Sequence, residues 1–207
     1  MKRKQNKKLK MIKESNEKPV RPKSKQELVK IIKEFIDKNG KKANLNFIDT
    51  SLITDMSNIF SIPFCRFFNG DISEWDTSNV RNMSQMFKNS MFNGDISNWD
   101  VSNVEDMSSM FENSRFNGDI SKWNTSSVKY MDNMFAYSYF KQDISNWDIS
   151  NVVDKKDMFL NINCKLSYCK ESIETIQPSS KDELLDIIEQ TIEEQGNKCR
   201  KYGIYVL

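Results

Sequence analysis

Hydrophobic positions recur at a fixed spacing of 24 residues through the middle of the chain. One series is Phe68, Phe92, Phe116 and Phe140, and another holds all the tryptophans, Trp75, Trp99, Trp123 and Trp147. A period in this range is typical of repeat proteins, in which each unit buries its apolar face only against its neighbours. We therefore expect one elongated array of stacked repeats.

Two hydrophobic periods alternate within each repeat. Trp75 and Thr77 keep the two-residue spacing of a strand, and the next apolar positions fall on one face of a short helix: Val80, Met83, Met86 and Phe87. The pattern predicts an α/β solenoid with one short strand plus one short helix in each 24-residue repeat. Its core is expected to be formed by columns of equivalent side chains: Trp75, Trp99, Trp123, Trp147, Phe87, Phe111, Phe135, Met83, Met107 and Met131.

An amphipathic helix is predicted before the array. Ser24 and Glu27 form a capping box, apolar residues follow on one face, and Asn39-Gly40 ends the segment. The same pattern returns 156 residues later, where Ser180 and Glu183 match Ser24 and Glu27. We therefore expect related helical modules at both ends of the array, which shield its apolar interior.

These patterns divide the chain into four parts. They are a basic disordered leader (1–21), an N-terminal capping helix module (22–44), the repeat array (45–163) and a C-terminal helix module (164–207) that repeats 22–44. The array consists of a divergent first repeat, 45–67, followed by 68–91, 92–115, 116–139 and 140–163.

Polar residues at fixed positions predict turns and caps. The Asn-Gly-Asp steps, such as 93–95, favour a turn with positive φ, and Ser102 with Glu105 fits a second capping box. Asn79, Asn103 and Asn151 fit a buried amide ladder between coils, interrupted by Ser127. Recurring aspartates such as Asp71 and Asp95 could bind Ca²⁺, but turn formation explains the same residues, so no cofactor or metal is expected.

The motif DISxWDxSNVxxMxxMFxxS, over residues 45–163, resembles the repeat of BspA-like leucine-rich-repeat surface proteins, a domain of unknown function. The resemblance implies a leucine-rich-repeat-like solenoid that makes protein contacts, often at bacterial or parasite surfaces, without catalytic activity. Lys155 and Asp157 depart from the repeat pattern, which suggests that the array ends near residue 155.

The charge is distributed unevenly along the chain. Residues 1–25 carry 11 Lys or Arg against 2 Glu, whereas the rest carries 20 against 27. The basic residues 2–13 could make a weak contact with a polyanion, or they could form a solvated leader. No apolar signal-peptide core and no membrane-spanning run follow them, so the sequence favours the cytoplasm, whereas the family resemblance suggests surface display.

Enzymatic chemistry finds little support in the sequence. The chain has no histidine, no nucleophile elbow and no phosphate-binding glycine loop, so we expect a non-enzyme without a small-molecule substrate. Its four cysteines make no CxxC pair and are expected to be free thiols.

Positions that vary between repeats are the candidate contacts for a protein partner. Two series differ from repeat to repeat, one before the tryptophans and one at the predicted helix starts: Glu74, Asn98 and Lys122, and Arg81, Glu105 and Lys129. We expect a protein-recognition or adhesion module. The alternative is an intracellular scaffold that its basic leader tethers to nucleic acid or to an anionic membrane.

Overall fold

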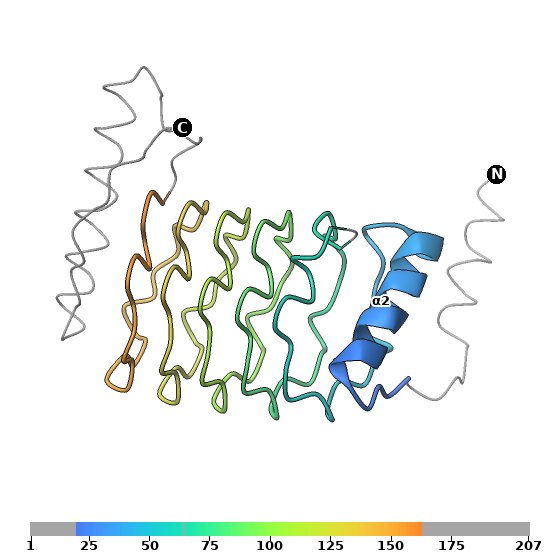
Figure 1. The fold of residues 1–207 in the computed structure, drawn as a ribbon, viewed down its shortest axis with the longest axis horizontal. Coiled ribbons are helices and arrows are strands. Elements are labelled where there is room, and N and C mark those ends of the chain that lie inside the picture. Colours follow the sequence, from blue (N-terminus) through green and yellow to red (C-terminus); the bar gives the residue numbers. More distant parts are fainter. Residues whose placement is uncertain (1–19, 64, 163–207) are drawn as a thin grey trace, which may run out of the picture.

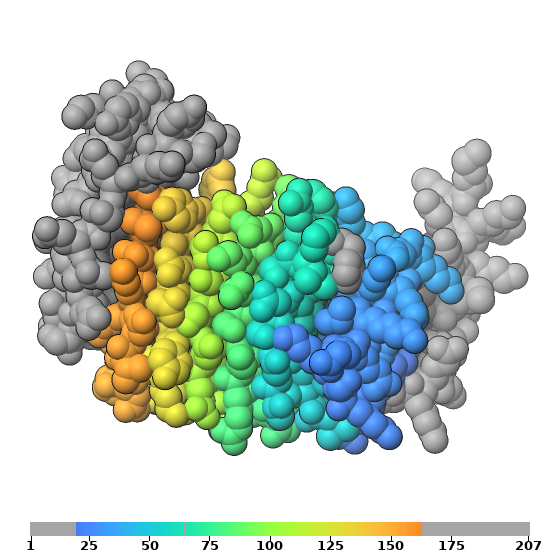
Figure 2. Space-filling model, in the orientation of Figure 1, coloured from blue at the N-terminus to red at the C-terminus, as the bar shows by residue number. Residues whose placement is uncertain are grey.

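The computed structural model describes residues 20–63 and 65–162. Helix α2 (Lys25–Asn39) lies at one end, and the chain that follows it winds into coils that lie side by side (Figure 1). In the space-filling view the coils form contiguous bands, each packed against the next (Figure 2). The repeats of the sequence are therefore the layers of the structure.

Helix α2 is bounded by the residues that favour its ends. The Ser24 hydroxyl accepts a hydrogen bond from the Glu27 N–H (3.2 Å), and the Glu27 carboxylate accepts one from the Lys23 N–H (2.9 Å). At the other end, the N–H of Gly40 donates to the Ile36 carbonyl, and Gly40 has a φ of 87°, which glycine adopts without steric cost. The apolar face, Leu28, Ile32 and Ile36, is buried.

The predicted α/β leucine-rich-repeat-like solenoid is wrong. The described residues contain α2 as their one helix and no strand, so the repeats are not built from a strand plus a helix. Neighbouring repeats meet instead at isolated parallel bridges, which join Asp55, Asn82, Asp106, Tyr130 and Asp154 in succession. The predicted C-terminal module, 164–207, lies outside the described residues.

The segment predicted to be helical in each repeat is a run of tight turns. In the repeat 68–91, the Met86 N–H donates three residues back to Met83, and Gln85 has a φ of 57°, which a right-handed helix excludes. Alternate N–H groups donate to the next coil: Met83 to Asp106, Gln85 to Ser108 and Phe87 to Met110, each at 2.9 Å. Bonding between coils therefore replaces the helical pattern, while the apolar side chains still point inward.

Columns of stacked side chains fill the interior. The rings of Phe60, Phe87, Phe111, Phe135 and Phe159 follow one another at centroid distances of 5.3–5.7 Å. A second column, Phe68, Phe92, Phe116 and Phe140, has spacings of 6.2–6.3 Å. The four tryptophans are only 3–4% exposed, and the methionines of the core, Met83, Met107 and Met131, are fully buried. Each of the repeats 68–91, 92–115 and 116–139 thus contributes one side chain to every column.

Each tryptophan also makes a polar contact with the preceding coil. The indole N–H groups of Trp75, Trp99, Trp123 and Trp147 donate to the carbonyls of Leu45, Ile72, Ile96 and Ile120 at 3.0–3.1 Å. A buried donor without an acceptor is costly, so this bond favours one register between coils. The tryptophan column therefore supplies both apolar burial and alignment.

Asx turns form the corners of the coils. In repeat 68–91 the side-chain oxygens of Asp71, Asp76 and Asn82 each accept from the N–H two residues on, at 2.8–3.1 Å. In 92–115 the same contacts are made by Asp95, Asp100 and Asp106. Local side-chain acceptors of this kind stabilise turns. Ser102 accordingly donates to Asp100 (2.6 Å) and forms no capping box with Glu105.

The Asn-Gly steps have a different role from the one predicted. Gly40 is the positive-φ glycine of the described residues, so Gly94 does not need a left-handed backbone. A Cβ on Gly94 would instead lie 2.8 Å from the ring of Phe92 and 3.1 Å from the Gly70 carbonyl oxygen. Glycine is required there because the chain passes closely over a core ring.

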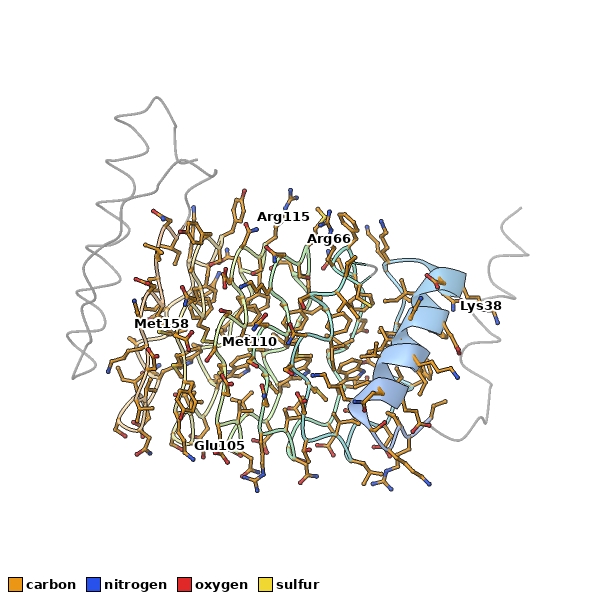
Figure 3. All side chains as sticks on the ribbon, viewed as in Figure 1. Lys38, Arg66, Glu105, Met110, Arg115 and Met158 are labelled. Carbon is orange, nitrogen blue, oxygen red and sulfur yellow. The ribbon has the colours of Figure 1, made fainter. Side chains whose placement is uncertain are left out.

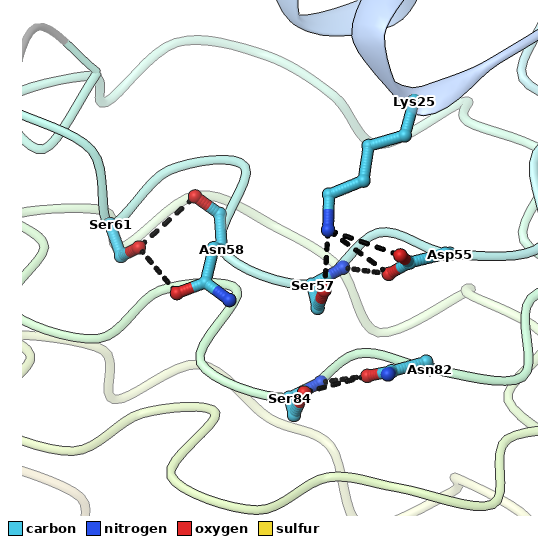
Figure 4. A network of polar contacts seen from close by, with 7 residues as sticks. All are labelled: Lys25, Asp55, Ser57, Asn58, Ser61, Asn82 and Ser84. Atoms are coloured by element: carbon cyan, nitrogen blue, oxygen red, sulfur yellow. Dashed lines mark hydrogen bonds and ion pairs between the residues drawn. The ribbon is translucent and has the colours of Figure 1, made fainter.

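A lysine of α2 forms polar contacts with the first coil. Lys25 Nζ lies 3.1 Å from a carboxylate oxygen of Asp55 and also donates to the Ser57 hydroxyl (Figure 4). The Lys25 side chain is about one quarter exposed, at 27%, so solvent screens this contact only in part. The contact adds a directed polar bond to the apolar docking of the helix.

Replacing Trp99 with alanine should lower the free energy of unfolding by about 3–5 kcal/mol, because a large buried ring and a hydrogen bond to Ile72 are lost together. Chemical denaturation followed by circular dichroism measures the change. Trp99→Phe, which keeps a ring in the column, is the matched control and should cost less. A loss below about 1 kcal/mol for the alanine variant would contradict burial of the column.

Stability should fall with acid as the pH drops below the ordinary aspartate pKa of 3.8. Hydrogen bonds from neighbouring serines hold the pKa values of four exposed carboxyls below that value: Asp95, Asp100, Asp119 and Asp148. A depressed folded-state pKa means that the unfolded chain binds more protons, so stabilisation is present above the ordinary pKa and is lost as the pH falls through the folded value.

The urea midpoint at pH 3 should therefore be lower than at pH 6. Replacing these four aspartates with asparagine should leave a smaller difference between the two midpoints, because the amide oxygen keeps the turn without titrating. Asn124 already makes this turn, accepting from the Ser126 N–H at 3.2 Å. Equal midpoints of the unsubstituted chain at the two pH values would argue against the carboxylates.

Lys25→Gln should weaken the docking of α2 by about 1 kcal/mol, since a partly exposed charged hydrogen bond is lost. Hydrogen exchange should then accelerate in the amides of α2 and remain unchanged in the coils. Lys30→Gln is the control, because Lys30 lies exposed on the same helix. Equal exchange in the two variants would show that apolar packing alone holds α2.

Candidate interaction surface

The residues predicted to bind a partner lie in two rows across the coils. Arg81, Glu105 and Lys129 form one row, because the N–H of Glu105 donates to the Arg81 carbonyl and the N–H of Lys129 donates to Glu105, both at 2.8 Å. Glu74, Asn98 and Lys122 are exposed at equivalent positions of another corner. Figure 3 shows Glu105 at the lower edge of the molecule. The two series thus lie on the surface at different corners.

The first row is a ladder of alternating charges. Glu105 lies between two cations: its carboxylate is 3.0 Å from Arg81 Nη1 and 2.7 Å from Lys129 Nζ. Hydrogen bonds from Lys129 and Arg81 hold the pKa of Glu105 below its ordinary value, and the bond to Glu105 raises the pKa of Lys129. All three side chains keep substantial exposure, at 38–66%. They are ordered by one another yet remain accessible.

A second ladder of polar groups runs beside the charges. Side-chain amides donate to the carbonyl of the preceding coil: Asn79 to Ser51, Asn103 to Ser78 and Asn151 to Ser126, at 2.7–2.9 Å. This ladder lies at the surface, not in the core as predicted. Ser127 does not interrupt it, because its hydroxyl donates to the Ser102 carbonyl. The ladder holds the backbone beneath the charged row.

The two ladders border a shallow groove of about 500 Å³. It is lined by Arg81, Asn103, Glu105, Ser126, Ser127, Lys129, Asn151 and Val153. Val153 continues the charged row on the next coil and is 66% exposed, the largest value among the exposed large hydrophobic residues of the described chain. The groove therefore combines alternating charges, amide groups and one apolar contact.

A smaller hollow lies at the other corner. Its volume is about 270 Å³, and it is lined by Asp95, Ser97, Asn98, Asp119 and Lys122. Asn98 and Lys122 thus share a depression, but Glu74 does not line it. The Glu74 N–H donates instead to the Asn46 side chain (3.1 Å). The structure therefore brings together two of the three residues of this series.

The edge of the coils opposite Glu105 was not predicted as a surface of interest from the sequence. Figure 3 shows Arg66 and Arg115 at this upper edge, and Phe67, Tyr137 and Tyr139 are exposed by 36–39%. The sequence already indicated this edge, because the large residues Phe67 and Tyr139 precede repeating phenylalanines by one residue. A large residue before each repeat start has no role in the core, which could have identified this surface.

Other chemistry is sparse in the part of the chain that the structure describes. Within residues 20–63 and 65–162, no three His, Cys, Asp or Glu residues are grouped as metal ligands, and no helix could cross a membrane. Cys65 is buried and free, and burial raises the pKa of its thiol to about 12, so the thiol stays protonated. Cys164, Cys169 and Cys199 lie outside the described residues.

Comparison with known proteins assigns the chain to a family. A model of that family matches residues 29–115 and 111–177, which include most of α2 and the repeats. No curated protein and no solved structure matches the chain. Since the two matches together cover more than half of the 207 residues, the chain belongs to the family described as Mycoplasma protein of unknown function, DUF285.

Proposed function

We propose that the chain is a non-catalytic recognition module that binds a partner protein through the groove beside Arg81, Glu105 and Lys129. An adhesion module is the version that the resemblance to BspA-like leucine-rich-repeat surface proteins implies. The observation that carries the proposal is the ladder in which Glu105 pairs with one cation from each neighbouring coil. Such a row presents a fixed pattern of charges to a partner.

The backbone beneath the groove supports this role. Bridges and cross-coil hydrogen bonds fix the distance between successive coils, so each coil displays its variable residue at a defined position. A regular scaffold with varied exposed side chains is how repeat proteins bind extended partners. Complementary charges on a partner would speed its association and fix its alignment on the groove. The exposed Val153 would add an apolar contact.

The lowered pKa values of the carboxyl groups favour a role in binding over a role in catalysis. A general acid near neutral pH needs a raised pKa, whereas the pKa values of Asp95, Asp119 and Glu105 are lowered by hydrogen bonds. These groups remain charged acceptors that form turns or ion pairs. The Cys65 thiol is likewise a poor nucleophile, because its raised pKa keeps it protonated.

The test is affinity capture with the full chain, carried out from intracellular extract and from extracellular matrix proteins and quantified for each captured protein. Glu105→Lys should reduce retention of the true partner about tenfold, because it places a third positive charge between two cations. Glu112→Lys is the matched control: Glu112 pairs with Lys88 of the neighbouring repeat (2.6 Å), away from the groove. It should leave retention unchanged.

Two results would overturn the proposal. One is a set of saturable partners that Glu105→Lys and Glu112→Lys affect equally. The other is the absence of any saturable partner for a chain whose unfolding midpoint shows that it is folded. The extract that supplies a partner sensitive to Glu105 would also indicate the compartment in which the module acts.

A further inference from the structure

The edge opposite the groove carries one large side chain on each of four successive coils. We call Phe67, Met91, Arg115 and Tyr139 the edge strip. Backbone bonds keep the strip in register: the N–H groups of Met91, Arg115 and Tyr139 donate to the carbonyls of Arg66, Ser90 and Ser114 at 2.8, 3.1 and 3.3 Å. Phe67 and Tyr139 are 36% and 39% exposed. The strip is therefore a continuous row of large, accessible groups.

Three cations, Lys41, Arg66 and Arg115, lie at this edge. Lys41 Nζ and Arg66 Cζ lie 4.3 and 4.5 Å from the centre of the Phe67 ring. Among the described residues, neither Arg66 nor Arg115 forms an ion pair with a carboxylate, whereas Lys88 is paired with Glu112. The two guanidinium groups are thus available to carboxylates of a partner, to which arginine binds in a bidentate manner.

The phenylalanine column beside this edge has a spacing close to that of alternate side chains in an extended peptide. The strip residues precede the column of Phe68, Phe92, Phe116 and Phe140, whose rings are 6.2–6.3 Å apart. Side chains on one face of an extended strand recur every two residues, at about 6.6–6.8 Å. A strand laid across the coils would therefore offer one side chain to each coil, with an accumulated mismatch of about 1–2 Å over the strip.

We propose that the edge strip, together with Arg66, binds an extended acidic segment of a protein partner. Carboxylates at positions i and i+4 of the segment would face Arg66 and Arg115, and apolar side chains at i+2 and i+6 would face Met91 and Tyr139. This surface goes beyond the proposed function, because it shares no residue with the groove beside Glu105 and lies at the opposite edge (Figure 3).

The composition of the edge favours a peptide over a nucleic acid. Aromatic residues, methionine and arginine are the side chains enriched in protein interfaces and in their hot spots. Nucleic-acid binding depends on neutralising many phosphates. The described residues carry 17 Lys or Arg against 19 Asp or Glu, so their overall field does not attract a polyanion.

The test uses the full chain and a fluorescein-labelled peptide, Ser-Glu-Ser-Leu-Ser-Glu-Ser-Leu-Ser, in a fluorescence anisotropy titration at low salt. We expect saturable binding that Arg66→Gln with Arg115→Gln weakens at least about tenfold. Arg81→Gln is the matched control, because it removes the same charge beside the groove and should change the dissociation constant less than about twofold. Arg115→Gln alone repeats the test if the double variant unfolds at lower urea.

The spacing has a separate control peptide, Ser-Glu-Ser-Leu-Ser-Ser-Glu-Leu-Ser, which has the same composition but places its second carboxylate on the opposite face. It should bind at least about fivefold more weakly. The proposal is overturned by equal binding of the two peptides, by no saturable peptide binding, or by binding of labelled oligo(dT) alone that depends on the same arginines. None of these results bears on the capture experiment with Glu105→Lys, so the two proposals fail independently.

Discussion

The structure depends on backbone hydrogen bonds that leave one coil and end on the next. In an α-helix or a two-stranded hairpin, a segment satisfies its peptide groups with nearby partners in the sequence. Here the N–H groups of Met83 and Phe87 find their acceptors in the following repeat. No coil can therefore satisfy its own backbone. The free energy of folding must come from contacts between neighbours, and unfolding of one coil would leave polar groups of its neighbours without partners.

The stacking of the side chains follows from this hydrogen bonding between coils. Coils held at a constant separation place equivalent residues directly above one another, so the phenylalanine rings stack almost parallel, with an interplanar angle of 1° between Phe60 and Phe87. Wide, flat side chains fill such columns well because offset stacking of aromatic rings is favourable and buries a large apolar area. The corners need tight turns at equivalent positions of every coil, and the Asx turns within each repeat supply them. Backbone spacing, ring stacking and turn chemistry thus have the same period.

The sequence was informative where one residue type implies one environment. The 24-residue period, the tryptophan positions and the capping box at Ser24 all correspond to buried columns or to a helix end in the structure. It was misleading for the segment 80–87, because the spacing of Met83, Met86 and Phe87 suits both a helix and a run of turns. What distinguishes them is whether N–H groups donate within the segment or to another coil, and a local pattern carries no information on that choice.

The candidate surfaces were predictable to different degrees. Variation between repeats made Arg81, Glu105 and Lys129 candidate contacts, but did not predict that they pair with one another, since pairing depends on the lateral alignment of three coils. The arginines of the opposite edge gave no periodic signal, because Arg66 and Arg115 occupy different positions of their repeats.

The indole bonds of the tryptophans have a consequence for how such a chain can change in length. Each tryptophan donates to the coil before it, so an interior repeat brings one donor and one acceptor of its own. Duplicating or deleting a whole repeat keeps the numbers of indole donors and carbonyl acceptors equal. Inserting a few residues within a repeat would instead shift every later residue out of its column. At the first coil of the described residues, which follows α2, Ile48 occupies the position of Trp75 and brings no buried donor. Gene duplication in units of one coil could therefore lengthen or shorten the molecule without redesign of its interior.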